Sequence, residues 1–420
     1  MSPARGEAME TIRDPGKPAR PLSRTADTSR AKTLLDWKPK ALAGGGASVD
    51  LSVDEQETQG FGKGEPAMTK SAAVRVGLVG AGHIARFAHL PSLCRLPQAT
   101  VSAICDEELE QARQAALDFG IPRTYSSLEK MLARERLDLV DICLPPHLHR
   151  DALVMALEQK VNCLVEKPLT MTTDDADTVM ALAREKGVNL HVIHNYSVIP
   201  AVLKAKALVA KGAIGRVVGV HINYFVPFAP RHLDPEHWCH SLPGDYFSEV
   251  GPHLALLLVE FLGPVDGVES VVAKVSSEPT VRFDELRVIA QTRQGLGTIA
   301  CSLNCPSRIL TLDIVGTQGA LHVNGDYQAV VHHGAIDTSM NAWGRGAAGA
   351  KDIVARAAAL AWTSANVLTG RYALEIMGHR YLIEKSLRSL LGRGTYPIDT
   401  GLAREAVRLL ELAFGEIRVK

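Results

Sequence analysis

Two short stretches, far apart in the chain, carry the side chains best suited to acid–base chemistry. The first is Glu166-Lys167-Pro168, where the proline keeps the preceding lysine out of the helical region and fixes its direction. The second runs from Gly244 to His253. A lysine ammonium can hydrogen-bond a substrate hydroxyl and a nicotinamide ribose, and a neutral imidazole can accept a hydroxyl proton while hydride leaves the same carbon. Together the two stretches indicate hydride transfer from an alcohol.

The second stretch predicts how its histidine is held. Pro252 suits the first position of a helix, so we expect a helix over residues 252–262 with His253 in its first turn. The positive end of that helix disfavours an imidazolium and would keep His253 neutral near pH 7. Glu249, four residues earlier, would orient the imidazole or hold a substrate hydroxyl. The alternatives are a histidine that only caps or packs and, in the first stretch, an ordinary surface lysine.

A glycine-rich turn follows an apolar run at residues 74–79. It reads Gly80-Ala81-Gly82-His83-Ile84-Ala85, a G-x-G-x-x-A form of the dinucleotide-binding fingerprint. Gly80 allows the tight turn, Gly82 lets a pyrophosphate approach the backbone, and Ala85 lets the helix pack closely on the strand. The phosphates would then meet free N–H groups at the helix N-terminus. A turn that serves only close strand–helix packing is the alternative.

Further residues of the predicted cofactor site stand at the ends of later apolar runs. Asp106 follows the run at 99–105, where a carboxylate can bind the adenosine ribose hydroxyls and repel a 2′-phosphate, which favours NAD over NADP. His147 follows the run at 137–144 and is expected on the nicotinamide side. The predicted cofactor-binding residues are Gly80, Gly82, His83, Ile84, Ala85, Asp106, Pro145, His147, Glu166 and Lys167.

From residue 74 the chain alternates apolar runs with segments of helical periodicity. The runs that predict buried strands are 74–79, 99–105, 137–144, 162–165 and 190–195. Such alternation predicts right-handed βαβ units and a parallel sheet, whose nucleotide sites lie off the carboxyl ends of the strands. Pro91 is expected to bend or interrupt the first helix, at 81–96.

After Tyr196 strands dominate. The predicted strands are 216–226, 267–275, 285–292, 297–304, 309–315 and 320–323, and helices are expected at 351–366, 373–391 and 401–417. We therefore predict an α/β protein with an N-terminal Rossmann domain at 68–195 and a C-terminal α+β domain at 196–420. The second domain is expected to contain a large, mostly antiparallel sheet with one open face, a natural surface for a homodimer or homotetramer.

The boundary between these two domains and one later loop supply candidates for substrate binding. Asn195 and Tyr196 stand at the boundary and are expected to bind substrate together with His253, with a role in the core or in a hinge as the alternative. Trp238 would stack on a sugar ring. The nearby residues His232, His237, Cys239 and His240 match no common zinc spacing, so a substrate loop or solvated turn is predicted there, and no metal.

Residues 1–67 differ in composition from the rest. They are rich in Pro, Gly, Ser, Thr and charge without a sustained period, which predicts disorder. The part at 27–40 resembles the closing segment of extended short-chain nucleotide-sugar epimerases. Our hypothesis is that the working protein begins near Met68 and that the upstream part is a fusion remnant or a misassigned start.

The overall composition argues against several classes of protein. A formal net charge of zero gives no electrostatic case for binding nucleic acid or an anionic membrane. The longest apolar candidate for a membrane span, at 357–370, is too short, and the first residues lack the apolar core of a signal peptide. Seven cysteines without a C-x-x-C motif favour reduced thiols in a cytoplasmic enzyme.

In this order the motifs resemble the glucose–fructose oxidoreductase / inositol dehydrogenase / MocA family, over residues 74–417. The resemblance rests on residues 80–85, on Leu144-Pro145-Pro146-His147-Leu148-His149, on Val165-Glu166-Lys167-Pro168-Leu169, on Gly212-Ala213-Ile214-Gly215-Arg216-Val217 and on Glu249-Val250-Gly251-Pro252-His253. It implies an NAD(P)-dependent dehydrogenase or reductase that acts on a sugar or cyclitol hydroxyl. Lys167 and His253 match the family's catalytic lysine and histidine, and Glu249 would assist them.

Some positions depart from the family's pattern. The family usually has Asp where this chain has Glu249, it often has an acid where this chain has Leu256, and its glycine run is thinned here to Gly244. The departures suggest an unusual pocket, and the epimerase-like segment favours a nucleotide-linked sugar. Two alternatives remain: an enzyme that keeps NAD bound and recycles it within one turnover, and a sensor or scaffold that binds NAD without catalysis.

Overall fold

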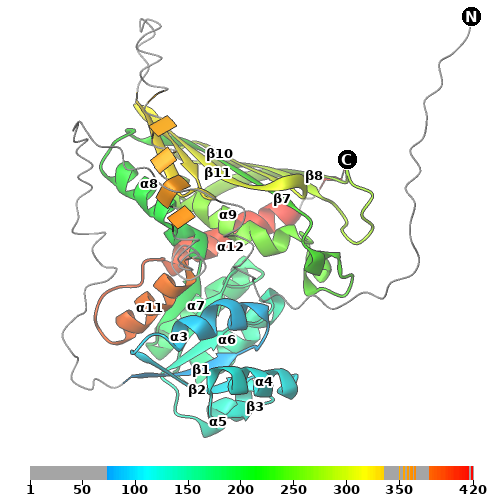
Figure 1. Cartoon of the computed structure of the whole chain (residues 1–420), viewed down its shortest axis with the longest axis vertical. Helices are drawn as coiled ribbons and strands as arrows, with labels where there is room; N and C mark the ends of the chain where they lie inside the picture. Colours follow the sequence, from blue (N-terminus) through cyan, green and yellow to red (C-terminus); the bar gives the residue numbers. More distant parts are fainter. Residues whose placement is uncertain are drawn as a thin grey trace, which may run out of the picture. The chain divides into compact units, whose positions relative to one another are not determined.

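The computed structural model describes residues 73–334 and 378–415, the short strand at 418–419 and scattered residues between 350 and 365 (Figure 1). The predicted tail at 1–67, its segment at 27–40 and the start at Met68 lie outside the described residues. So does much of the helix predicted at 351–366.

The first sheet is parallel, as predicted. Its six strands have the order β3-β2-β1-β4-β5-β6 and all pair in parallel. The strands are β1 (Val74–Val79), β2 (Ala99–Cys105), β3 (Thr124–Tyr125), β4 (Leu139–Ile142), β5 (Asn162–Glu166) and β6 (Leu190–Ile193). The connecting α-helices after β2 are α4 (Leu109–Phe119), α5 (Leu128–Arg134), α6 (His149–Glu158) and α7 (Thr173–Lys186). This is the doubly wound order of a Rossmann domain, in which ligands bind at the point where the order reverses, between β1 and β4.

The helix after β1 contains a wide turn. The segment η1 (Ala85–His89) has π geometry, with the Leu90 N–H donating to the Ala85 carbonyl, and α3 (Leu90–Leu93) continues it. Pro91 has no N–H to donate and its ring crowds the carbonyl four residues earlier, so a regular α-turn is strained there and a wider turn relieves the crowding. The helix continues through Pro91, where we expected a bend or an interruption, and His89 in the wide turn directly before α3 is fully buried.

The second sheet is mixed but mostly antiparallel, also as predicted. Its order is β13-β12-β11-β7-β10-β9-β8-β14, and the described pairs are antiparallel except β7 with β10 and β8 with β14. The strands are β7 (Val217–Pro227), β8 (Val265–Ala273), β9 (Glu285–Thr292), β10 (Leu296–Ser302), β11 (Asn304–Gly316), β12 (Gly319–Asn324), β13 (Ala329–Gly334) and β14 (Arg418–Val419). Neither β13 and β14 here nor β3 of the first sheet was predicted from the sequence.

Helices cover one face of this sheet (Figure 1). The helix α8 (Pro200–Ala210) contacts β12 and β13, α9 (Phe247–Leu262) contacts β7 and β10, and α12 (Thr400–Gly415) contacts β8. Side chains along β9 therefore alternate between buried and exposed, as a half-covered strand requires. The other face exposes apolar side chains, among them Ile289 and Leu296.

The start of α9 corrects one prediction. We expected this helix to begin at Pro252, but it begins at Phe247, so Pro252 lies inside it and His253 is in its second turn. Phe247 and Val250 are buried in the core, and their burial favours extending the helix upstream. Among the described residues no helix is long and apolar enough to cross a membrane.

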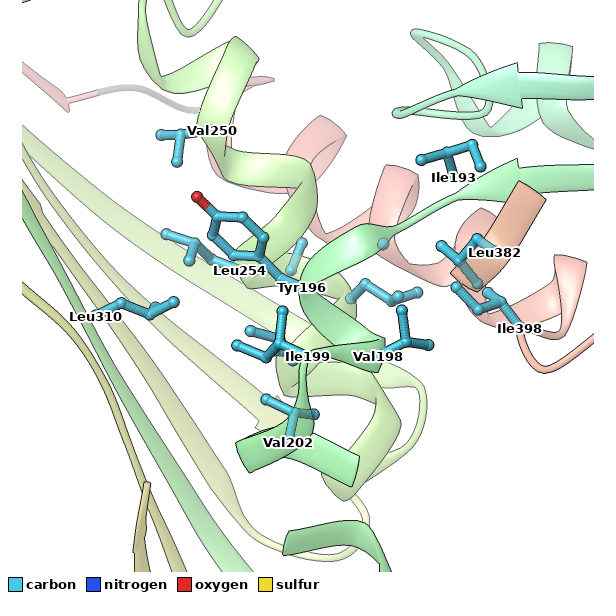
Figure 2. Close-up of a cluster of buried hydrophobic side chains, with 14 of the residues drawn as sticks. Ile193, Tyr196, Val198, Ile199, Val202, Val250, Leu254, Leu310, Leu382 and Ile398 are labelled. Carbon is cyan, nitrogen blue, oxygen red and sulfur yellow. The ribbon is translucent and has the colours of Figure 1, made fainter. Parts of the chain in front are cut away.

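A buried cluster fixes the segment between β6 and α8 (Figure 2). Tyr196 and Val198 belong to a 3-10 turn, η3 (Asn195–Val198), and both side chains are buried. Figure 2 shows Tyr196 beside Leu254 of α9 and Leu310 of β11. On the other side of the segment, Leu382 and Ile398 complete the cluster, the former from α11 (His379–Leu390). The position of Tyr196 is thus set by packing from both halves of the described chain.

Candidate active site

Lys167 and His253 meet at one place in the fold. Lys167 directly follows β5, and its Nζ donates a hydrogen bond of 2.9 Å to the backbone carbonyl of Glu249. Glu249 lies in the first turn of α9, and His253 lies about one turn further along. The charge of Lys167 contributes to lowering the pKa of His253, so the two side chains are also electrostatic neighbours. The two stretches that the sequence analysis singled out are therefore adjacent.

The turn at Lys167 is tied to the neighbouring strand. The Lys167–Pro168 peptide bond is cis. The buried ring of His149, at the start of α6, contacts the Pro168 carbonyl through Nδ1 at 2.7 Å and the Leu144 carbonyl through Nε2 at 2.9 Å. His149 thereby links the segment after β4 to the segment after β5, at the carboxyl edge of the parallel sheet.

His253 is neutral, for a different reason from the one predicted. Burial lowers its pKa well below 6.5, and the charge of Lys167 lowers it further. Because α9 begins at Phe247, the residue is not in the first turn that we invoked. The residue as a whole keeps partial exposure, while its Nδ1 is buried without a hydrogen-bond partner among the described residues. The imidazole thus presents a neutral, partly accessible ring next to an ammonium.

An aromatic ring and a guanidinium border this imidazole. The ring of Tyr196 stacks on His253, with ring centroids 4.2 Å apart. Its hydroxyl accepts a hydrogen bond of 3.1 Å from Nη2 of Arg308, on β11. Arg308 is held in turn by Asp326 through Nε at 2.9 Å. The predicted substrate residue Tyr196 therefore lies beside His253, and the large sheet contributes Arg308, which the sequence analysis did not single out.

The glycine-rich turn has the form that a dinucleotide needs. Gly80 has a φ of +90°, and a Cβ there would lie 2.6 Å from the Cys143 carbonyl oxygen. A Cβ on Gly82 would meet nothing within 4 Å, so space is open in front of that backbone. Asp106, at the end of β2, accepts a hydrogen bond of 2.7 Å from the Ala81 N–H. The turn therefore fits a bound pyrophosphate, and Asp106 stands directly beside it.

The other residues predicted for the cofactor and substrate sites differ in how far they are buried. Ala85 is buried, Ile84 is partly buried, and His83 is exposed and stacks on Phe87. Pro145 is partly buried and His147 is exposed after β4. Asn195 is buried beside Tyr196, whereas Trp238 is partly buried and has its recorded ring contact with His237.

Side chains of the loop at residues 232–240 contact one another and Asp245. His240 Nδ1 lies 2.6 Å from Asp245 Oδ1, and the other oxygen of Asp245 accepts the Arg282 N–H at 2.7 Å. His237 Nδ1 lies 3.0 Å from the Cys239 sulfur. The side chain of His232 lies outside the described residues.

Two buried histidines near the site were not predicted from the sequence. His89, in the wide turn η1, and His379, at the start of α11, both contact the carboxylate of Glu166. Glu166 itself is only 4% exposed, with its carboxylate directed into the interior. A single histidine inside a helical pattern carries no spacing signal, so only the fold could bring these side chains together.

Two family models match the chain in tandem. The model of the oxidoreductase family with an NAD-binding Rossmann fold matches residues 74–194, and that of the GFO/IDH/MocA C-terminal domain matches residues 202–322. Together they span more than half of the chain and include the residues of the candidate site discussed above except Asn195, Tyr196, Asp326 and His379.

Several curated relatives are named as dehydrogenases of sugars or nucleotide-linked sugars. D-apiose dehydrogenase of Paraburkholderia graminis is 25% identical over 265 residues, which cover 61% of this chain and 69% of the relative. UDP-N-acetylglucosamine 3-dehydrogenase of Acidithiobacillus ferrooxidans is 30% identical over 161 residues, covering 38% of this chain and 48% of the relative.

The fold also matches solved structures. The WlbA dehydrogenase from Bordetella pertussis, solved in complex with NADH and UDP-GlcNAcA, aligns with a TM-score of 0.67 at 21% identity, over 83% of this chain and 96% of that one. Together with the two consecutive family matches, this likeness in fold leads to one assignment. The chain belongs to the glucose–fructose oxidoreductase / inositol dehydrogenase / MocA family of NAD-binding oxidoreductases.

Proposed function

We propose that this protein transfers hydride between NAD and a carbinol carbon of a sugar or cyclitol, with a nucleotide-linked sugar as the favoured substrate. The observation that carries the proposal is the 2.9 Å contact between Lys167 Nζ and the Glu249 carbonyl, because it brings the ammonium to the helix that bears His253. The relatives that act on UDP- and dTDP-linked sugars support the nucleotide-linked class.

In this proposal the glycine-rich turn and its neighbours hold the cofactor. The residues assigned to it are Gly80, Gly82, His83, Ile84, Ala85, Asp106, Pro145, His147, Glu166 and Lys167. Bound NAD supplies the acceptor for the hydride, and its reduced form supplies the donor. The carboxylate of Asp106 favours NAD over NADP because it would repel a 2′-phosphate.

The protein's own contribution is to hold the reacting hydroxyl and to move its proton. His253 is neutral, and its Nδ1 is buried, so Nε2 is the nitrogen that accepts the hydroxyl proton during oxidation and returns it during reduction. Lys167 donates to the same oxygen and steadies its developing negative charge. Glu249 assists from the first turn of α9, and Asn195, Tyr196 and Trp238 orient the substrate.

A direct test is an assay of the purified protein with NAD⁺ and NADP⁺ against neutral sugars, cyclitols and nucleotide-linked sugars. NADH formation with a member of the panel is the expected result. Nucleotide that leaves only on denaturation and does not exchange with added NAD would instead favour an enzyme that recycles its own cofactor. NAD binding without any turnover across the panel would favour a sensor or scaffold, as the substitutions at Glu249 and Leu256 allow.

Replacing Gly82 with alanine separates cofactor binding from folding. The added methyl group meets nothing within 4 Å in the folded chain, but it enters the space that we assign to the pyrophosphate. We expect the Kd for NAD, measured by calorimetry, to rise about tenfold or more, which corresponds to about 1.4 kcal/mol. The melting temperature without NAD should stay close to that of the parent protein.

Gly80→Ala is the matched control. Its φ of +90° and the 2.6 Å approach to the Cys143 carbonyl predict strain of about 1–3 kcal/mol and a melting temperature lower by several degrees. If Gly82→Ala binds NAD as tightly as the parent, the assignment of the pyrophosphate site is wrong.

We also propose that the protein is a cytoplasmic homo-oligomer assembled through the open face of the large sheet. Exposed apolar side chains on that face, Val271, Ile289 and Leu296, support a second copy as the occupant. The seven cysteines are free thiols, as expected for a reducing compartment.

Ile289→Asp tests the oligomer. Because a charge buried at the interface is costly, we expect light scattering after size exclusion to show a smaller species than the parent forms. Leu117→Asp, on α4 and 79% exposed, is the matched control and should leave the size unchanged. An unchanged size for Ile289→Asp, or a monomeric parent, contradicts this assembly.

A further inference from the structure

A buried histidine bridges two carboxylates beneath Lys167. His89 Nδ1 lies 2.8 Å from Asp141 Oδ2, and His89 Nε2 lies 2.8 Å from Glu166 Oε1. His89 and Asp141 are fully buried, and Glu166 is 4% exposed. The three residues come from separate elements, η1, β4 and β5, and no step of the proposed reaction uses His89 or Asp141.

The geometry calls for a proton on each ring nitrogen. Ionised carboxylates only accept hydrogen bonds, so a histidine between two of them must donate from both Nδ1 and Nε2, as an imidazolium does. Burial alone lowers the pKa of His89, but the charge of Asp141, its hydrogen bond and the smaller contributions of Cys143 together outweigh burial, and the pKa lies well above 6.5. Burial alone raises the pKa of Glu166, but hydrogen bonds from His379 and His89 outweigh it and hold the pKa well below 4.5.

A metal ion fits this cluster less well than a proton. His89, Glu166 and His379 each offer one ligand atom, and these atoms lie within 4.8 Å of one another. Ligands of a tetrahedral zinc ion at about 2.0–2.1 Å from the metal stand about 3.3 Å apart. The 2.8 Å between His89 Nε2 and Glu166 Oε1 is shorter and is the length of a charge-assisted hydrogen bond.

The bridged carboxylate is bonded to the backbone of Lys167. Glu166 Oε2 accepts the Lys167 N–H at 3.2 Å, while Oε1 faces His89 and, at 3.5 Å, Nε2 of His379. Glu166 therefore contacts His89 of η1, His379 of α11 and the backbone of the next residue. Rotation of the Glu166 carboxylate would break its hydrogen bond with the backbone N–H of Lys167, whose Nζ contacts Glu249 of α9.

We propose that His89, as a buried imidazolium between Asp141 and Glu166, is a positioning residue that fixes Lys167 for catalysis. The inference rests on the proposed function, because it assigns Lys167 a catalytic task. His89 acts through Glu166 and touches neither substrate nor cofactor. His379 supports the same carboxylate from α11 and thereby joins the C-terminal segment to the site.

Two buried histidines, His379 and His89, lower the pKa of Glu166, and His89 also contacts Asp141. The Glu166 carboxylate contacts the rings of His89 and His379 and the backbone N–H of Lys167, and Asp141 contacts the other ring nitrogen of His89. The other titratable groups within reach of its charge are Cys143, His149, His194, His253 and Tyr396. Burial keeps His194 and His253 neutral by lowering their pKa, and keeps Cys143 and Tyr396 neutral by raising theirs. Burial also lowers the pKa of His149, while its contacts with two backbone carbonyls act in the opposite direction.

His89→Gln tests the proposal through a pH profile. Without the imidazolium the pKa of Glu166 rises, so activity should fall as the pH falls through this raised value, and the acidic limb of kcat should move to higher pH. We expect kcat to drop about 10–100-fold at neutral pH, with the Kd for NAD within a few-fold of the parent value. The double variant His89→Gln/Glu166→Gln has no carboxylate at position 166 to titrate. The shift of the acidic limb of kcat should therefore disappear, although kcat itself stays low.

His191→Gln is the matched control. His191 is also a buried histidine, but it bonds Ser386 and stacks on Tyr396, and burial lowers its pKa to about 4. A comparable loss of melting temperature with an unmoved pH profile is expected there. A folded His89→Gln variant with the parent's kcat and pH profile would overturn the inference while leaving the proposed function intact. A Lys167 variant with full activity would overturn the proposed function itself.

The protonation of His89 can also be measured directly in the parent protein, without substrate, so the test does not depend on whether His89→Gln folds. In protein labelled with ¹⁵N-histidine, one imidazole should keep both ring nitrogens protonated well above pH 6.5. Asp141→Asn should abolish that signal, because it removes the charge that supports the proton. A stoichiometric divalent metal in the purified parent protein, or the absence of such a doubly protonated imidazole, would show that His89 is not an imidazolium and would overturn the proposal.

Discussion

Lys167→Ala is expected to lower kcat by about 10²–10⁴-fold on the substrate that the panel identifies, and to raise the Kd for NAD because Lys167 is also assigned to the cofactor. The ammonium donates to the Glu249 carbonyl at 2.9 Å and contributes to lowering the pKa of His253, so its loss removes both a hydrogen-bond donor and a charge at the reacting oxygen. Steady-state kinetics and calorimetric titration with NAD measure the two quantities separately.

The control is a lysine far from the proposed reaction. Lys211, at the end of α8, is exposed, and Lys211→Ala should keep the parent's kcat and KM. Lys167→Met keeps the length of the side chain without its charge, so it should match the alanine variant if charge is what matters. Turnover that survives intact in both Lys167 variants would show that the catalytic assignment is wrong.

The sheets could be predicted from the sequence because each depends on a local pattern. Continuous apolar runs such as Val74–Val79 and Ala99–Cys105 fit strands buried on both faces, and their predicted limits coincide with β1 and β2. The alternation along Glu285–Thr292 fits a strand with one open face, β9. The start of α9 was missed because Pro252 is a strong local signal, while the burial of Phe247, which extends the helix, is decided by tertiary packing.

The candidate site was predictable only in part, for a related reason. Lys167 and Gly82 sit in motifs whose backbone geometry is encoded locally, by a following proline or by the lack of a side chain. His89 and His379 become neighbours of Glu166 only when a wide turn and a distant helix meet β5. Arg308 likewise reaches Tyr196 across the two halves of the chain. No spacing of residues in the sequence predicts these contacts.

The state of His253 shows how a correct expectation can have a different cause. A helix N-terminus was expected to keep the imidazole neutral, but burial and the Lys167 charge do so instead. The two causes predict different behaviour, because a helix terminus is unaffected by changes at position 167. The pH dependence of the Lys167 variants therefore distinguishes them.

The second large effect is expected at His253 and in the pH dependence of turnover. His253→Gln keeps a polar side chain but cannot accept a proton, so kcat should fall about 10²–10⁴-fold. In the parent the base stays neutral well below pH 6.5, so the acidic limb of kcat/KM for oxidation should lie well below that of an ordinary histidine. Residual activity of Lys167→Met should show this limb moved to higher pH, because one of the causes that lower the pKa of His253 is gone.

The same residue links catalysis to acid stability. The folded pKa of His253 lies below the unfolded value of about 6.5, so the unfolded state binds the proton first and stability falls as the pH falls below that value. His194, whose pKa burial lowers to about 3, acts in the same direction. His253→Gln should therefore lose less stability than the parent between pH 6.5 and pH 4, as denaturant unfolding at each pH would measure. An equal loss in both proteins, together with an acidic limb near pH 6.5 in the parent, would mean that His253 titrates as an exposed histidine and does not serve as the buried base.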